Sequence, residues 1–224
     1  MPVSTNSDAE LSDFLLRACH DLRGPLRTMR IYSELLASRA GTGPETEQSL
    51  GFVMKGATTA AALVDGITDY ALALVIDPLR FQQVPLDVML RSAMAKLSAQ
   101  IREHDADISY GDLPTLRGNG DRLLQLFEYL LDYSLRRKIA DRVTVRISAE
   151  AQPGEWLFSV RDNGAPLTSE ALERVFKPFA RVDGNERPGP GLATCRAIVE
   201  RHGGRMWAEA IADGGLIRFT LADG

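Results

Sequence analysis

A histidine beside a carboxylate is the feature of this sequence best suited to group-transfer chemistry. His20 is followed directly by Asp21, and Pro25 lies one helical turn further on. His20 stands two positions past the apolar residue Ala18, roughly 200° round a helix and therefore on its solvent side. An exposed imidazole next to a proton acceptor suits a nucleophile. A plain surface histidine has the same local features, so both interpretations stand at this point.

Two further groups of polar and glycine residues come later in the chain. Asp162-Asn163-Gly164 ends a segment of alternating apolar residues, and Gly189 and Gly191 precede a helical segment. Glycines before a helix can present backbone N–H groups to a phosphate. Taken singly, the first group is equally typical of a turn and the second of a helix cap.

Two long helices must position His20. Apolar residues recur at alternating spacings of three and four on both sides of a Gly-Thr-Gly-Pro turn at residues 41–44, which predicts a helical hairpin. The predicted seam consists of Leu11, Leu15, Ala18, Leu22, Pro25, Met29, Tyr32 and Leu36, followed by Leu50, Val53, Ala57, Ala60, Val64, Ile67, Ala71 and Leu74. Because one hairpin leaves such a seam half exposed, we expect two hairpins to pair as a homodimeric four-helix bundle.

Beyond Pro78 the chain alternates between helical and strand patterns in mixed order. We expect helices at 86–101, 121–137 and 192–201. Strands are expected at 106–110, 115–117, 142–150, 156–160, 205–210 and 216–221. This order favours an α+β fold, a sandwich with helices on one face of a sheet. The predicted domains are therefore residues 9–77 and 79–224.

Composition excludes several classes of function. The 26 basic and 30 acidic residues are well mixed, so no basic stripe indicates nucleic acid. No uninterrupted run reaches the ~18 apolar residues of a membrane span, and the first residues lack the pattern of a signal peptide. Cys19 and Cys195 read as reduced thiols. We therefore expect a cytoplasmic protein without a membrane segment.

The residues around His20 favour the interpretation of His20 as a nucleophile over that of a plain surface histidine. His20-Asp21-Leu22-Arg23-Gly24-Pro25-Leu26 resembles the H-box of sensor histidine kinases, particularly the phytochrome-like branch. The resemblance implies that His20 accepts a phosphoryl group, that Asp21 is its general base, and that the partner is the receiver domain of a response regulator. Gly24 departs from the Thr or Asn typical of the family, which argues against phosphatase activity.

The resemblance continues through the second domain. Residues 160–164 resemble the G1 box, residues 175–179 the F-box, and Gly189 with Gly191 the G2 box of the ATP-binding domain shared by histidine kinases, gyrase and Hsp90-type ATPases. It implies that Asp162 and Gly164 bind adenine, that Arg136, Gly189 and Gly191 contact phosphate, and that the cofactors are ATP and Mg²⁺.

Several positions depart from that ATP-binding pattern. Tyr129 and Tyr133 stand where the family's N-box has two asparagines, the second of which binds Mg²⁺. A phenol is a poor magnesium ligand, and Asp132 points about 100° away round the helix, so we expect no protein-held metal. Pro166 and Arg187 replace glycines of the G1 and G2 boxes.

Three functions follow from these observations. The first is a histidine kinase that labels His20 from ATP, although the altered N-box argues against self-phosphorylation. The second is a nucleotide-independent histidine phosphotransferase in a phosphorelay. The third is a non-enzymatic dimer that regulates another kinase, which an intact His20-Asp21 pair disfavours.

Overall fold

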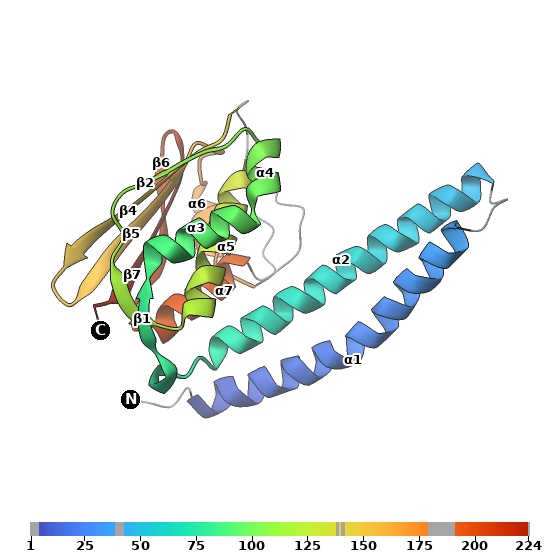
Figure 1. The fold of residues 1–224 in the computed structure, drawn as a ribbon, viewed down its shortest axis with the longest axis horizontal. Helices are drawn as coiled ribbons and strands as arrows, with labels where there is room; N and C mark the ends of the chain where they lie inside the picture. Colours follow the sequence, from blue (N-terminus) through green and yellow to red (C-terminus); the bar gives the residue numbers. More distant parts are fainter. Residues whose placement is uncertain (1–4, 39–42, 138, 140–141, 179–190, 224) are drawn as a thin grey trace. The chain divides into compact units, whose positions relative to one another are not determined.

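The computed structural model describes residues 5–38, 43–137, 139, 142–178 and 191–223. The chain divides into two compact units, one extending to Val75 and the other beginning at Ile76 (Figure 1). Each unit is described by itself below.

The first unit is a helical hairpin. Helix α1 spans Thr5–Ala37 and helix α2 spans Pro44–Leu74, lying side by side along their length (Figure 1). Pro44 occupies the first turn of α2, where its missing N–H costs no helical hydrogen bond. Helix α1 runs unbroken through Pro25. Of the predicted turn, residues 41 and 42 lie outside the described residues.

Short side chains at intervals of seven or fourteen residues form the contact between the two helices. Ser12, Cys19 and Ser33 are buried on α1, as are Ala57, Val64 and Ala71 on α2. The Ser12 hydroxyl donates to the carbonyl of Ala71 at 2.9 Å, which fixes the antiparallel register. Side chains this short let the two backbones approach closely.

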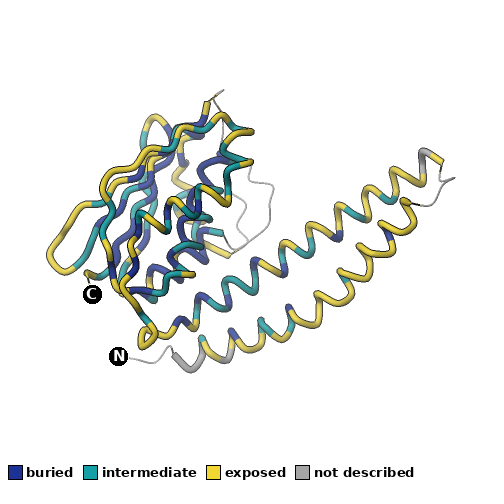
Figure 2. The backbone as a smooth tube through the Cα atoms, viewed as in Figure 1, coloured by how far each residue is buried: buried dark blue, intermediate teal, exposed yellow. Residues whose placement is uncertain are grey.

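The predicted seam of α1 is wrong as the contact with α2. Its members Leu11, Leu22, Met29, Tyr32 and Leu36 are exposed in the single chain, because each lies beside the small-residue face and not on it. Figure 2 shows that most of α1 is exposed. On α2 the predicted seam does include the three buried residues. The hairpin thus leaves a row of large apolar side chains uncovered, here called the apolar stripe: Leu11, Leu22, Met29, Tyr32 and Leu36.

Helix α2 also differs from the expectation about membrane segments. Its residues Thr46–Leu74 are long and apolar enough to cross a membrane by length and composition. The expectation considered uninterrupted apolar runs, whereas α2 reaches this mean hydropathy through alanines spread among polar residues. A bundle helix passes the same test, so one such helix is weak evidence for a membrane span.

The second unit is a five-stranded sheet with helices on one face, which confirms the predicted α+β fold class (Figure 1). Strand order is β2-β4-β5-β7-β6, with β2 and β4 parallel and the other pairs antiparallel. The strands are β2 (Asp107–Tyr110), β4 (Thr144–Gln152), β5 (Glu155–Asp162), β6 (Met206–Ile211) and β7 (Gly214–Ala222). The helices are α3 (Leu86–Lys96), α4 (Ser98–Glu103), α5 (Gly120–Arg136), α6 (Ser169–Arg174) and α7 (Gly191–Arg201).

The core of this unit lies between the sheet and helices α5 and α7. Helix α5 buries one face, including Leu123, Leu126, Phe127, Leu130 and Leu131, at helical spacing. On the sheet side, the rings of Phe158 and Phe219 stack with centroids 4.7 Å apart. Burial raises the pKa of the Cys195 thiol, so this free cysteine is unreactive and structural.

Four local elements differ from the sequence expectations. The helix predicted at 86–101 is two helices, because the chain leaves helical geometry at Leu97. Three short elements were not predicted, namely the 3-10 helix η1 (Pro78–Arg80), strand β1 (Gln82–Pro85) and helix α6. Strand β1 pairs with β3 (Thr115–Gly118) as a second sheet. The Thr168 side chain, which accepts from the N–H of Ala171, is a cap that marks the start of α6.

His202 joins three parts of the second unit. Its Nε2 accepts from the backbone N–H of Asn119 at 3.0 Å, its Nδ1 lies 2.7 Å from the carbonyl of Ile198, and its ring stacks on Phe81. Burial lowers the pKa of this imidazole despite the bond to Ile198, in keeping with a neutral ring. His202 is thus a structural residue at the end of α7.

Candidate functional site

His20 lies on the solvent side of α1. Its side chain is 86% exposed, and Nδ1 lies 3.3 Å from the carboxylate of Asp21, which is equally open. One residue before it, Cys19 is buried against α2, so the helix turns His20 away from the contact between the helices. A proton on Nδ1, held by Asp21, leaves Nε2 with a free lone pair aimed at solvent.

The surroundings of His20 hold α1 in place without covering the ring. Arg23, about one turn further on, reaches across to α2 and contacts Asp65 and Thr68, each at 3.1 Å. At Gly24 an added Cβ would meet no described atom within 4 Å. Packing within the described chain therefore does not require a glycine at this position.

Asp162 lies at the end of β5 and is buried. One of its oxygens, Oδ1, accepts from the backbone N–H groups of Gly164 at 2.9 Å and Gly215 at 3.2 Å. The guanidinium of Arg137 lies against the same carboxylate, with Nε 3.5 Å from Oδ1. A buried carboxylate needs such partners, and here the chain itself supplies them.

Arg137 caps the end of α5 and fills the space beside Asp162. Its side chain is 2% exposed. The guanidinium donates to the Tyr133 hydroxyl at 3.1 Å and to the carbonyl of Ala165, and it lies 5.2 Å from the centre of the Tyr133 ring. A Cβ built at Gly164 would come within 2.7 Å of the Arg137 Cβ. The surface next to Gly164 is therefore occupied by Arg137.

Arg136, the predicted phosphate contact, is engaged within its own helix. Its guanidinium binds Asp132 through Nε at 2.9 Å and Nη2 at 2.5 Å. Asp132 therefore already has a cationic partner, and buried Tyr133 presents its hydroxyl to Arg137. Among the described residues no group of three His, Cys, Asp or Glu side chains could hold a metal ion.

The glycine pair of the predicted phosphate loop is only partly described. Gly191 begins α7 with φ +23, a value that L side chains rarely adopt, and Gly189 lies outside the described residues. The structure joins Asp162 and Gly164 by a hydrogen bond from the Gly164 N–H to Oδ1 of Asp162. It also adds Arg137 and Gly215, which the sequence reading missed.

As arranged, these residues do not fit ATP and Mg²⁺. Oδ1 of Asp162 already accepts from two backbone N–H groups, and Arg137 occupies the position beside it. The Tyr133 hydroxyl is a phenol that accepts from Arg137, a poor ligand for magnesium, and Oδ1 of Asp132 accepts twice from Arg136, so the guanidinium of an arginine already lies against each side chain. A nucleotide would have to displace Arg137 to reach Asp162.

Comparisons with known proteins agree with the fold. Residues 118–223 match the family model of histidine kinase-, DNA gyrase B- and HSP90-like ATPases. Cyanobacterial phytochrome A from Nostoc sp. is 32% identical over 97% of this chain, which spans 29% of that relative's length. The structure of full-length ShkA in complex with AMPPNP has a TM-score of 0.73 at 22% identity, over 95% of this chain and 46% of ShkA.

A second solved structure also covers both units. The histidine kinase ThkA in complex with the response regulator TrrA has a TM-score of 0.65 at 19% identity, over 95% of this chain and 61% of that one. At identities below 25%, these two structures establish the fold. The chain spans less than a third of the phytochromes it matches.

The Arg137–Asp162 pair should dominate the local stability of the second unit. Replacing Arg137 with Met leaves a buried carboxylate without its cation, and we expect a loss of about 3–5 kcal/mol in the free energy of unfolding. The matched control is Arg136→Met, which removes a more exposed pair and should cost ~1 kcal/mol or less. Urea unfolding measures both, and equal losses would contradict the buried pairing.

Proposed function

We propose that this chain, which is the core of a sensor histidine kinase, carries a phosphoryl group on His20 and passes it to the receiver domain of a response regulator. The observation that carries the proposal is the open His20–Asp21 pair on α1. In this proposal residues 9–77 form the dimerisation and phosphotransfer domain and residues 79–224 the ATPase-like domain. The setting is the cytoplasm, where receiver domains and ATP are available.

The proposed chemistry uses atoms of this chain. The Nε2 lone pair of His20 attacks phosphorus, and the bond between phosphorus and the donor's leaving oxygen breaks as a P–N bond forms. The proton on Nδ1 stays with its bond to Asp21, which stabilises the positive charge that develops on the ring. In the transfer to the receiver, an oxygen of the receiver forms a new bond to phosphorus as the P–N bond breaks, and the electron pair of the P–N bond returns to Nε2.

The donor of the phosphoryl group separates two versions of this function. Membership of the ATPase family favours ATP, with Asp162, Gly164, Arg136, Gly189 and Gly191 as its binding residues. The contacts of Arg137 favour the second version, a histidine phosphotransferase that takes phosphate from one response regulator and gives it to another. Such a relay needs no nucleotide. A non-enzymatic dimer would need no His20–Asp21 pair, so we rank that alternative third.

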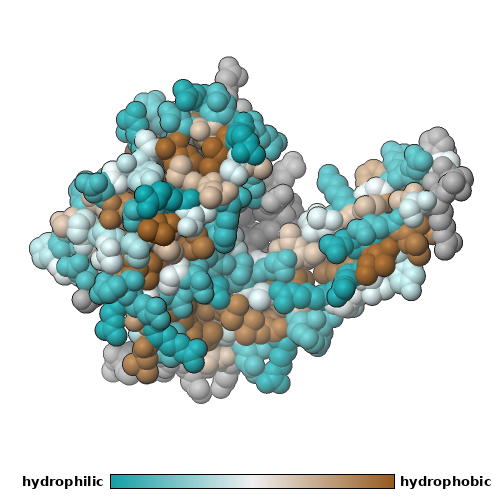
Figure 3. Space-filling view, viewed as in Figure 1, coloured by the Kyte–Doolittle hydropathy of each residue, from teal (hydrophilic) through white to brown (hydrophobic). Residues whose placement is uncertain are grey.

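Homodimerisation is part of the proposal. Large apolar side chains are exposed along α1, and Phe14 and Phe52 are more than 60% exposed. Figure 3 shows hydrophobic surface on the hairpin. Contiguous apolar surface of this kind is unfavourable in water unless a partner covers it. A second copy of the hairpin supplies matching apolar side chains, and pairing the two copies buries both.

The phosphorylation site is tested with two donors, radiolabelled Mg-ATP and a phosphorylated receiver domain. Label that reaches the chain should be acid-labile, as phosphohistidine is, and should be absent from His20→Gln. The matched control, His104→Gln, should be labelled like the unmodified chain. Label that persists in His20→Gln would move the site elsewhere.

The same experiment distinguishes the two versions. Rapid labelling from the receiver domain with none from Mg-ATP supports the relay. Labelling of the unmodified chain from Mg-ATP at ordinary kinase rates, ~1–100 s⁻¹, would refute it and support self-phosphorylation.

Dimerisation is tested by placing a charge in the apolar stripe. Met29→Asp should weaken the dimer by about 100-fold, roughly 2.8 kcal/mol, because pairing would bury an unpaired carboxylate. The neighbouring variant Thr28→Asp adds the same charge about 100° away round α1 and should leave dimerisation intact. Sedimentation measures both. A monomeric unmodified chain at micromolar concentration would contradict the proposal.

A further inference from the structure

The open face of the five-stranded sheet carries a row of positive charge. Strand register places Ser109, Arg146, Arg161 and Leu216 next to one another across β2, β4, β5 and β7. The next row on this face runs from Ser148 to Ser159 to Arg218. Because strand residues alternate between faces, Arg161 lies on the open face while neighbouring Asp162 is buried beneath the sheet.

Arg146 and Arg161 are direct cross-strand partners. Like charges in this relation destabilise a sheet, since the Cβ atoms are only about 5 Å apart. Within the described part of the chain, neither guanidinium has an ion pair or a side-chain hydrogen bond. Because no acidic side chain among the described residues offsets the repulsion between Arg146 and Arg161, an anion bound between them would stabilise the sheet.

Arg218 adds a third cation to the same surface. Its guanidinium has one acidic neighbour, Glu209, at 3.5 Å, and that carboxylate also accepts from Trp207. The buried Nε of Arg218 has no hydrogen-bond partner among the described residues.

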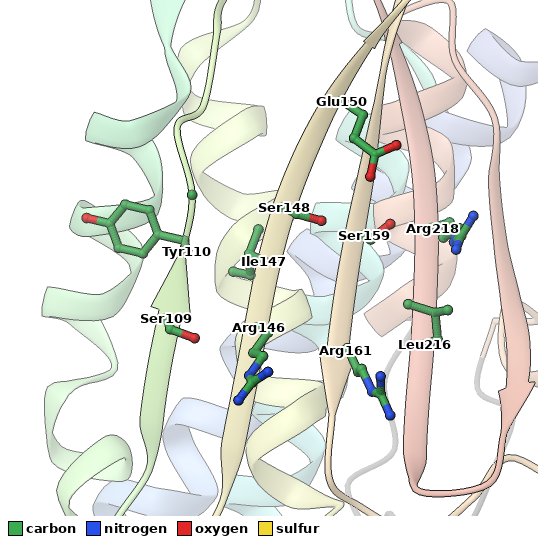
Figure 4. Close-up of a pocket in the computed structure, with 11 residues that line it drawn as sticks. Ser109, Tyr110, Arg146, Ile147, Ser148, Glu150, Ser159, Arg161, Leu216 and Arg218 are labelled. Carbon is green, nitrogen blue, oxygen red and sulfur yellow. The ribbon is translucent and has the colours of Figure 1, made fainter.

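These side chains line one cavity. It is open to solvent, has a volume of about 590 Å³, and includes the hydroxyls of Ser109, Ser148 and Ser159 along its floor (Figure 4). In Figure 4, Arg146 and Arg161 extend toward the same end of their strands, and Glu150 lies toward the other end. The positive end of the cavity is therefore distinct from its acidic end.

We propose that this cavity, here called the arginine face, binds a small organic compound with two linked phosphate groups. One phosphate would bridge the guanidiniums of Arg146 and Arg161, whose planar donors match phosphate oxygens in pairs. The second would meet Arg218, which stands diagonally from Arg161 across β5 and β7, about 7–8 Å away at the backbone and within reach of long side chains. The three serine hydroxyls donate to the remaining oxygens. This site is separate from Asp162 and independent of the proposed role of His20.

The test uses inorganic pyrophosphate and tripolyphosphate with the full chain, at constant ionic strength. Calorimetry should show saturable binding with one site per chain. Arg146→Ser and Arg161→Ser should each weaken it by about tenfold or more, as loss of a charge-assisted bidentate contact does. The matched control is Arg91→Ser on α3, an exposed arginine far from the cavity in the fold, which should bind like the unmodified chain.

Melting temperatures add a second measurement that needs no ligand. Removing either Arg146 or Arg161 relieves a like-charge pair, so each variant should melt at or above the temperature of the unmodified chain.

Equal binding of sulfate at the same ionic strength would overturn the proposal, because simple screening would then account for it. Unchanged pyrophosphate affinity in both arginine variants would overturn it as well. ATP binding that is lost in these variants but kept in Asp162→Asn would place the nucleotide's phosphates on this face.

Discussion

The buried ion pair between Arg137 and Asp162 joins the end of α5 to the end of β5. Through Oδ1 of Asp162 it also holds Gly164 in the following loop and Gly215 at the start of β7. Two opposite charges out of water remain stable only when their hydrogen-bonding capacity is largely met. The same atoms that stabilise this corner of the sandwich therefore surround the carboxylate that the resemblance to the ATPase family assigns to adenine. If adenine binds there, it has to replace contacts that stabilise the fold.

The hairpin shows a comparable division of roles between neighbouring residues. Small side chains such as Ser12 and Cys19 let α1 approach α2, and the larger residues beside them form the apolar stripe. His20 projects from the side opposite that stripe, so a second hairpin can cover the apolar residues without covering the imidazole. The proposed dimer would thus leave His20 open to a phosphoryl donor.

Periodicity predicted much of this fold from the sequence. The hairpin, the sheet strands and helices α5 and α7 follow from patterns within one element, where burial and spacing are linked. The α1 seam was placed one residue away from the true contact because the pattern selects large apolar residues, whereas close helix packing selected Ser12, Cys19 and Ser33. Leu97 interrupts a helix although its sequence is apolar and continuous, which no local signal revealed.

The site was less predictable, for a physical reason. Asp162 and Gly164 are close in sequence and could be grouped by motif, whereas Arg137 reaches them only through the packing of α5 on the sheet. One signal was available in the sequence. Arg137 lies four residues after Tyr133, a spacing that puts the two side chains next to each other on a helix, so a contact between the guanidinium and the phenol could have been predicted. The contacts of the same guanidinium with Asp162 and Ala165 join residues far apart in the sequence, so they could be found only in the folded chain.

The Asp162 carboxylate receives its hydrogen bonds and its ion pair from within the chain, and no nucleotide is needed to supply them. The amide signals of Gly164 and Gly215 report directly on these hydrogen bonds. The unmodified protein, labelled with [¹⁵N]glycine, is titrated with Mg-ATP up to about 1 mM, the upper range of typical KM values. We predict that both signals stay in place, because their hydrogen bonds to Asp162 and the Arg137 side chain are undisturbed. Saturable movement of both signals at micromolar ATP would show that the nucleotide reaches Asp162 readily, and would contradict the account.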